Sequence, residues 1–260
     1  MVIKTGIIPK VAISIGNIDI YWYAIFIVTG ILLGFLISKL KDGKLGIKFE
    51  NILDLCIFML PIAIICARLY YIAFSLEFYI NNPSEILNIR DGGLAIYGGI
   101  IGGVITAAIF CRIKKIKILD LLDFIAPCLA LAQAIGRLGN YVNIEAYGSE
   151  TNSILKMEIL ENGITKYVHP TFLYESIVTI FIFVFLSILT NRRRFSGEIT
   201  YLYIIIYSFA RIFIENLRTD SLMLFNYKIS LILSVLLFVV FSLIFVYSIY
   251  KNSKKVKNVE

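Results

Sequence analysis

Long apolar stretches dominate the sequence and constrain its fold more than any other feature. A helix needs about 20 predominantly apolar residues to cross the hydrocarbon core of a bilayer. The chain has 260 residues, of which 59% are hydrophobic and 17% are charged, whereas soluble domains average about 25% charged residues. Seven stretches have the required length, near residues 18–38, 51–74, 94–112, 118–136, 170–190, 198–217 and 229–250. We therefore predict an all-α integral membrane protein with seven transmembrane helices.

Two of these stretches are interrupted by charged side chains. Asp120 and Asp123 fall in the fourth stretch, and Arg211 and Glu215 fall in the sixth. We count both as spans. The fourth is the least regular candidate for a full crossing.

Basic residues form four clusters that follow every second stretch. These clusters hold 15 of the 25 Lys and Arg residues, at positions 39, 41, 44 and 48, at 112, 114, 115 and 117, at 192–194, and at 251, 254, 255 and 257. Cytoplasmic loops are enriched in Lys and Arg. The alternation therefore predicts an N-terminus outside and a C-terminus in the cytoplasm. It also explains the net charge of +7 without a nucleic-acid-binding face.

The longest connection, residues 137–169, lies on the outer side in this topology. It is rich in polar and turn-forming residues, among them Gly148, Asn152 and Gly163. We expect a small external subdomain there, between spans four and five, within a single membrane domain covering residues 1–260.

The cysteine and histidine content argues against a metal site. The four cysteines lack CxxC spacing and lie within or beside apolar stretches, and His169 is the single histidine of the sequence. Neither a zinc site nor a disulfide framework is expected.

Several ionisable residues lie within or at the ends of the predicted spans, where idle charge is costly and function is the default interpretation. They are Asp54, Arg68, Asp123, Arg137, Glu145, Glu175, Arg211, Glu215 and Arg218. Guanidinium groups bind phosphate bidentately, so an excess of arginines near the outer leaflet would attract a phospholipid headgroup. Two alternatives remain open. Arg68 could anchor its helix at the interface, and residues 211, 215 and 218 could form an intrahelical ion-pair ladder.

Three short runs add polar or small residues at the span ends. In residues 92–103, six glycines accompany Tyr97, which permits close helix packing or access of a substrate to the backbone. Residues 136–148 combine Arg137 with two asparagines, a glutamate and three glycines. In residues 169–175, Thr171 is expected to N-cap the fifth span, with His169 just before it.

Together these runs resemble the prolipoprotein diacylglyceryl transferase family of bacterial inner membranes. The matching segments are residues 22–24, 91–102, 123–127, 136–148, 169–175 and 207–218. The resemblance implies transfer of the diacylglyceryl group of phosphatidylglycerol to the lipobox cysteine of a prolipoprotein signal peptide, with release of glycerol phosphate. It implies no metal or other cofactor and no nucleic acid, and it places the chain in the bacterial cytoplasmic membrane.

The resemblance also implies roles for individual residues. Arg137 and Arg211 would be essential and stabilise the leaving phosphate. Tyr97 and His169 are candidates for deprotonating the thiol. A third possibility is that the positive charge of the arginines, here called the arginine field, favours the thiolate without a separate base. Many family members carry histidine at the position of Tyr97, which leaves that role open here. The residues expected to line or support the lipid site are Tyr23, Gly98, Gly99, Asn140, Asn143, Glu145, Gly148, Tyr207, Glu215 and Arg218.

A transporter or flippase for an anionic lipid or metabolite is the rival interpretation, because arginines and glycines also line permeation paths. The seven stretches show no internal duplication, and the ionisable residues gather toward one leaflet rather than along a full path. Both observations favour the transferase.

Overall fold

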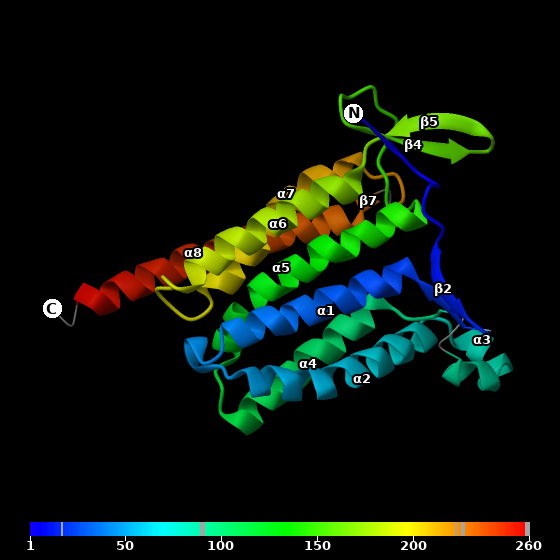
Figure 1. The fold of residues 1–260 in the computed structure, drawn as a ribbon. Coiled ribbons are helices and arrows are strands. Elements are labelled where there is room, and N and C mark those ends of the chain that lie inside the picture. Colours follow the sequence, from blue (N-terminus) through cyan, green and yellow to red (C-terminus); the bar gives the residue numbers. More distant parts are fainter. Residues whose placement is uncertain (17, 89–91, 222, 225–226, 258–260) are drawn as a thin grey trace. The chain divides into compact units, whose positions relative to one another are not determined.

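The protein is described by a computed structural model covering residues 1–16, 18–88, 92–221, 223–224 and 227–257. Asp91 of the segment 91–102 lies outside the described residues. The chain divides into two compact units (Figure 1). The first unit is formed by residues 1–38 and 122–260, and the second by residues 39–121.

The described chain is mostly helical, as predicted. Its long helices are α1 (Trp22–Leu40), α2 (Phe49–Ala73), α4 (Ile96–Lys114), α5 (Ile118–Asn143), α6 (Thr171–Thr190), α7 (Glu198–Leu217) and α8 (Ile229–Lys257). Six of the described helices are long and apolar enough to cross a membrane, and α7 is not among them. Helix α7 has 20 residues, enough to span, but its charged side chains lower its hydropathy. The protein is thus a multi-pass membrane protein, while the seventh crossing stays a prediction.

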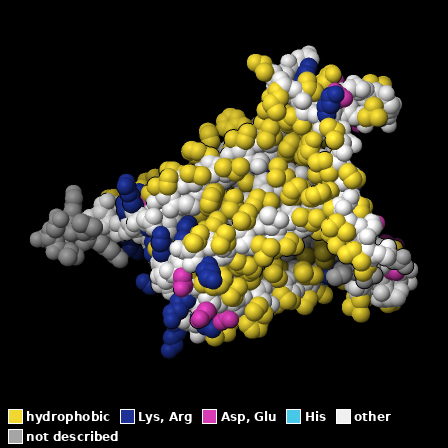
Figure 2. All heavy atoms as spheres, viewed as in Figure 1, with side chains coloured by type: hydrophobic (Ala, Val, Ile, Leu, Met, Phe, Trp, Pro, Cys, Tyr) yellow, Lys and Arg dark blue, Asp and Glu magenta, His cyan; other side chains and the backbone are white. Residues whose placement is uncertain are grey.

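The surface of the helices fits a lipid environment. Figure 2 shows hydrophobic side chains spread over much of the visible face, whereas Lys and Arg side chains gather mainly near helix ends. In α8, Leu236, Leu243 and Val246 are all more than half exposed. Side chains of this kind are stable on a helix surface when hydrocarbon rather than water surrounds them.

Some helix ends differ from the predicted span boundaries. Residues 18–21 do not begin the first helix. They form strand β3 (Ile18–Tyr21), which pairs antiparallel with β2 (Val11–Ile15). The fourth helix does not end at residue 136, since α5 continues to Asn143. It stops where Ile144 adopts a left-handed backbone with φ 54°, a conformation that cannot continue a right-handed helix.

The connection between α5 and α6 contains regular structure that was not expected from the sequence. Strands β4 (Lys156–Glu161) and β5 (Ile164–Val168) form a hairpin, and β1 (Val2–Lys4) pairs in parallel with β4. The two turn residues, Asn162 and Gly163, both have positive φ, as a tight hairpin turn requires. Residues 137–143 belong to α5, and the external subdomain over residues 137–169 stays a prediction.

A buried apolar cluster holds α5, α6 and α7 together in the first unit. Its members are Ala126, Ala130, Ile182, Leu186, Ile199 and Tyr203. The alanines of α5 face the larger side chains of the other two helices, so the three backbones can approach closely. This packing fixes the relative positions of the polar side chains at the far ends of the same helices.

In the second unit, glycines of α4 allow it to pack closely on α2. A Cβ at Gly98 would lie 2.5 Å from the Cβ of Tyr70, and one at Gly102 would lie 2.7 Å from the Cβ of Cys66. A Cβ at Gly99 would meet only ordinary contacts, the nearest being the Ala63 carbonyl oxygen at 3.7 Å. Helix packing therefore accounts for Gly98 and Gly102.

Arg68 of α2 organises the segment that precedes α4. This buried guanidinium donates to the backbone oxygens of Glu85, Ile86, Asn88, Gly92 and Gly93, at 2.5 to 2.9 Å. The first two oxygens belong to a 3-10 turn (Pro83–Leu87), which follows the short helix α3 (Leu76–Asn81). The described contacts of Arg68 thus give it a structural role, different from that of an interfacial anchor.

A second buried charge, Asp123 of α5, caps α7. Its Oδ1 accepts hydrogen bonds from the backbone N–H and the hydroxyl of Thr200, and its Oδ2 accepts from the Gly197 N–H and from Arg193 Nη1. The distances are 2.7 to 3.0 Å. Arg193, which belongs to the basic cluster at residues 192–194, therefore also pairs with a buried carboxylate.

Replacing Asp123 with Ala should destabilise the protein by about 3 kcal/mol, because it removes the buried acceptor of the Gly197 and Thr200 N–H groups and of the Thr200 hydroxyl, together with an ion pair to Arg193. The measurement is thermal unfolding of the purified protein in detergent. Asp54→Ala is the matched control, since its ion pair with Lys114 is about 40% exposed on both sides and should contribute less than about 1 kcal/mol. Equal losses in the two variants would contradict the capping role.

Candidate functional site

The carboxylate of Glu175 is the centre of a buried polar cluster in the first unit. Glu175 lies on α6 and is 3% exposed. Its Oε1 accepts from Arg137 Nη2 and, at 2.7 Å, from the hydroxyl of Tyr207. Its Oε2 accepts from Arg211 Nη1 at 2.6 Å. One carboxylate thus joins side chains of α5, α6 and α7.

Each arginine has a further partner that fixes its plane. Arg211 Nη2 lies 2.6 Å from Glu215 Oε2, one helical turn away on α7. Arg137 Nη1 donates to Asn140 Oδ1 at 3.1 Å, also one turn away on α5. Two contacts per guanidinium restrict its rotation, so the two groups are held in place before any ligand binds.

The contact network continues along the end of α5. The side-chain amides of Asn140 and Asn143 donate to Glu145 Oε1 at 2.9 and 3.1 Å. Arg137, Asn140 and Glu145 are therefore linked by consecutive hydrogen bonds. The predicted site residues that this network brings together are Arg137, Asn140, Asn143, Glu145, Tyr207, Arg211 and Glu215.

The charges of the cluster are balanced, contrary to the expected excess of arginines. The two guanidinium groups of Arg137 and Arg211 face the two carboxylates of Glu175 and Glu215. Arg218 forms a bidentate pair with Asp220, at 2.9 Å for both contacts. The predicted ladder through residues 211, 215 and 218 is thus only half formed, because Arg218 ends α7 in extended backbone and turns toward Asp220. Pairing is expected here, since an unpaired charge is costly in a low-dielectric site.

Gly148 lies where three segments of the first unit come close together. Its N–H donates to the carbonyl of His169 at 2.9 Å, and a Cβ placed on it would lie 2.8 Å from the Cβ of His169 and 3.0 Å from the Leu217 carbonyl oxygen. Gly148 also forms an isolated bridge with Arg218. The absence of a side chain therefore allows the segment after α5 to contact both the start of α6 and the end of α7.

At the start of α6, His169 contacts a tyrosine, and the expected N-cap at Thr171 is not formed. Its Nδ1 lies 3.2 Å from the Tyr174 hydroxyl, and among the described contacts none joins its ring to Glu175. Thr171 does not N-cap α6, since it is the first helical residue and its hydroxyl donates to the Ala146 carbonyl instead. That contact fastens the segment after α5 to the start of α6.

The backbone beside Glu145 is strained. Ile144 and Ala146, which flank it, have φ values of 54° and 55°, unusual for residues with a Cβ. A cavity of about 290 Å³ opens next to this segment. It is lined by Ile144, Glu145, Ala146, Tyr147, Thr219 and Asp220. Glu145 thus lines a cavity while its carboxylate is hydrogen-bonded to the Arg137 network.

Tyr23 joins the site through a glycine of α5. A Cβ at Gly139 would overlap the Tyr23 ring, so the ring packs directly on the α5 backbone, two residues beyond Arg137. Tyr23 is 40% exposed. The remaining predicted residues, Tyr97, Gly98 and Gly99, lie on α4 in the other unit, where Tyr97 is exposed and Gly98 packs on α2.

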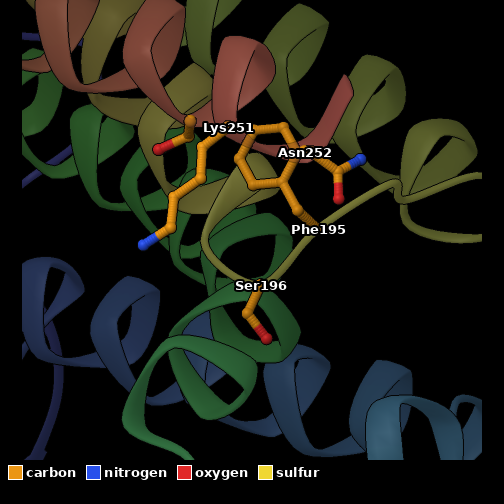
Figure 3. A pocket seen from close by; sticks show the side chains of 5 residues that line it. Phe195, Ser196, Lys251 and Asn252 are labelled. Carbon is orange, nitrogen blue, oxygen red and sulfur yellow. The ribbon is translucent and has the colours of Figure 1, made fainter. Parts of the chain in front are cut away.

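Another cavity lies at the opposite end of α7, away from the Glu175 cluster. It has a volume of about 200 Å³ and is lined by Phe195, Ser196, Ser248, Lys251 and Asn252 (Figure 3). Figure 3 shows Ser196 on the connection before α7 and Lys251 and Asn252 on α8. It contains none of the predicted site residues.

Glu175 is the member of the site whose role was hardest to infer from the sequence. It stands out there as an ionisable residue inside a span, but no role is assigned to it. The signal that could have found it was its position one turn inside α6, where an unpaired carboxylate would be unstable. A partner was therefore required, but the sequence did not identify which arginine would supply it.

Comparison with known proteins identifies the family. A family model described as prolipoprotein diacylglyceryl transferase matches residues 10–247. The chain belongs to this family. A relative from Finegoldia magna, named phosphatidylglycerol–prolipoprotein diacylglyceryl transferase, is 46% identical over 87% of the chain and 90% of its own length. Relatives of the same name from Clostridium novyi and Listeria monocytogenes are 42% and 45% identical, over 95% and 89% of this chain and 98% and 87% of their own lengths.

Within this family member, Gly148→Ala should disrupt the site, because the new Cβ collides with backbone and with the Cβ of His169. We expect a clear drop in thermal stability, by at least about 1 kcal/mol. Gly136→Ala is the control, since a Cβ there meets nothing within 4 Å and alanine favours the helix. Unfolding of both variants in detergent measures the difference. A Gly148→Ala protein as stable as the control would refute the close packing.

Proposed function

We propose that this protein transfers the diacylglyceryl group of phosphatidylglycerol to the thiol of a prolipoprotein lipobox cysteine. The products are a thioether-linked lipoprotein precursor and glycerol phosphate. The observation that carries the proposal is the convergence of Arg137 and Arg211 on Glu175 in a member of the diacylglyceryl transferase family. Two immobilised guanidinium groups at one place suit a phosphate group.

The proposed reaction moves carbon rather than phosphorus. The thiolate sulfur attacks the glycerol methylene that carries the phosphate, and a carbon–sulfur bond forms as the carbon–oxygen bond breaks. The electron pair of the broken bond stays on the phosphate oxygen, so negative charge grows there. Fixed N–H donors at this position stabilise the transition state more than the ground state.

Glu175 and Glu215 are positioning residues in this proposal. A guanidinium has five N–H donors. The hydrogen bonds of the cluster use two donors of Arg137 and one of Arg211, whose contact with Glu215 is an ion pair. The remaining donors are available to the phosphate. The carboxylates thus hold the arginines ionised and oriented, and they leave part of each group free to bind the substrate.

The thiol must lose its proton, since its ordinary pKa of about 8.5 leaves little thiolate at neutral pH. Tyr97, His169 and the arginine field remain the candidates for this step. The described ring partner of His169 is Tyr174.

The other predicted residues serve the lipid in this proposal. Asn140, Asn143 and Glu145 continue the network from Arg137 to the neighbouring cavity. Gly148 and Arg218 support the meeting point of α5, α6 and α7. Tyr207 shares Glu175 Oε1 with Arg137, and Tyr23 packs on α5 at Gly139. Gly98 and Gly99 of α4 would also line or support the lipid site.

We further propose that α7 crosses the membrane as the sixth of seven spans. Its charged residues Arg211 and Glu215 are paired inside the protein, which removes most of the cost of placing them in hydrocarbon. The basic clusters then support an N-terminus outside and a C-terminus in the cytoplasm, with the protein in the bacterial cytoplasmic membrane.

The proposed activity is tested directly with the purified protein, phosphatidylglycerol and a lipobox peptide. The expected result is a peptide mass shift by one diacylglyceryl group, with an equal amount of glycerol phosphate released. Movement of phosphatidylglycerol between leaflets without either product would support the flippase instead.

Arg211→Lys should reduce the transfer rate by at least about 100-fold, because a lysine provides a point charge without the bidentate fork. Arg112→Lys, in a basic cluster at the end of α4, is the control. Initial rates are measured on protein whose thermal unfolding confirms that it is folded. Normal turnover by Arg211→Lys would exclude its role at the leaving group.

Tyr97→Phe and His169→Gln separate the candidates for the base. Each removes one proton acceptor with little change of shape, so the variant that lacks the base should slow the chemical step by about 100-fold. Single-turnover rates are compared from about pH 6 to about pH 9, a range that brackets the ordinary pKa values of histidine and of the thiol. If both variants keep the wild-type rate and profile, neither residue is the base and the arginine field remains.

A further inference from the structure

An apolar groove runs along the α2–α4 pair of the second unit. Its volume is about 410 Å³. The residues that line it are Phe58 and Ile62 of α2 together with Ile105, Thr106, Ile109, Phe110, Ile113 and Lys114 of α4. None of them belongs to the Glu175 cluster or to the cavity beside Glu145.

The groove offers an apolar surface along most of its length. Thr106 contributes no free donor, because its hydroxyl donates to the Gly102 carbonyl at 2.8 Å. Phe58, Ile109 and Ile113 are 59%, 54% and 71% exposed. On helices that cross a membrane, these side chains lie against hydrocarbon.

The shape of the groove suits a chain aligned with the helices. Its lining on α4 runs from Ile105 to Ile113, a rise of about 12 Å at about 1.5 Å per residue. Acyl chains lie roughly parallel to membrane-spanning helices, so a groove of this direction can hold part of one chain lengthwise.

A cation marks one end of the groove. Lys114 Nζ lies 2.7 Å from Asp54 Oδ2 and 5.7 Å from the centre of the Phe110 ring. Arg112 and Lys115 lie beside it in sequence, and α4 ends here as Lys115 adopts φ 55°. Basic residues at a helix end attract anionic headgroups. Since Asp54 balances the charge of Lys114, the net positive charge at this end comes from Arg112 and Lys115. Apolar lining and this net charge together complement a phospholipid, whose charge lies at one end of its acyl chains.

We propose that this groove is a binding site for an anionic glycerophospholipid. One acyl chain lies between α2 and α4, and the phosphate faces Lys114, in the leaflet at the basic ends of these helices. The site is separate from the proposed catalytic cluster, and it does not depend on the transferase activity.

The test uses photoactivatable lipids on the full-length protein in nanodiscs made of neutral lipid. One probe is a phosphatidic acid with a diazirine in one acyl chain, and the other is a phosphatidylcholine with the same chains. After illumination, peptide mass mapping locates the adducts. The expected adducts lie within residues 58–62 and 105–113 and form preferentially with the anionic probe.

Two pairs of variants separate the two parts of the site. Ile109→Trp fills the groove and should abolish this labelling, whereas Val104→Trp, at an exposed residue of α4 outside the groove lining, should not change it. Lys114→Gln should reduce the preference for the anionic probe by about fivefold. Lys251→Gln, which removes a lysine in the other unit, should leave the preference unchanged.

Three outcomes would overturn the proposal. Equal labelling by both probes, unaffected by Lys114→Gln, would indicate ordinary surrounding lipid. Adducts that persist in Ile109→Trp would place the lipid elsewhere, and a wild-type protein that is dimeric and gains no adduct at these residues would make the groove an interface between copies. Because labelling requires no turnover, each outcome is independent of the proposed transferase activity.

Discussion

The pairing of one buried carboxylate with two arginines is the interaction on which the first unit depends. In a medium of low dielectric, neither Arg137 nor Arg211 is tolerated without a counter-charge, and Glu175 supplies it to both. Since the three residues come from α5, α6 and α7, the ion pairs also fix the relative rotation of these helices. The apolar cluster of the same helices brings them together, and the carboxylate determines which faces meet.

Both ends of α7 are fastened by acidic side chains of other helices. Asp123 caps its first turn from α5, and Glu175 holds Arg211 near its last turn from α6. A helix with several charged residues thereby becomes compatible with its surroundings. The same arrangement gives the site its rigidity, because Arg211 is carried on a helix that is fixed at both ends.

Much of this architecture was predictable from the sequence. The apolar stretches indicated the positions of the long helices, and the charged residues inside them indicated where the polar cluster would form. The run of residues 136–148 placed Arg137, Asn140, Asn143 and Glu145 near one another, because they follow closely along one short segment.

Long-range pairing was not predictable. The choice of Glu175 rather than Glu215 as the shared partner depends on how three helices pack, and the partner of Arg218 depends on how the chain turns after α7. Arg68 was equally ambiguous, because its acceptors are backbone oxygens, which every residue carries. The hairpin β4–β5 was missed, since its strands are short and one edge is completed by residues near the N-terminus.

The pairing of β1 with β4 sets an order of events during biogenesis. Strand β1 pairs with β4, whose Lys156 lies opposite Val2, and closing so long a loop is entropically unfavourable until the intervening helices have compacted. The helix pairs can form as each segment enters the membrane, whereas the sheet must wait for β4 to emerge on the same side as β1. The sheet can therefore form only after β4 has emerged, and its completion reports that the long helices α1, α2, α4 and α5 have already been inserted.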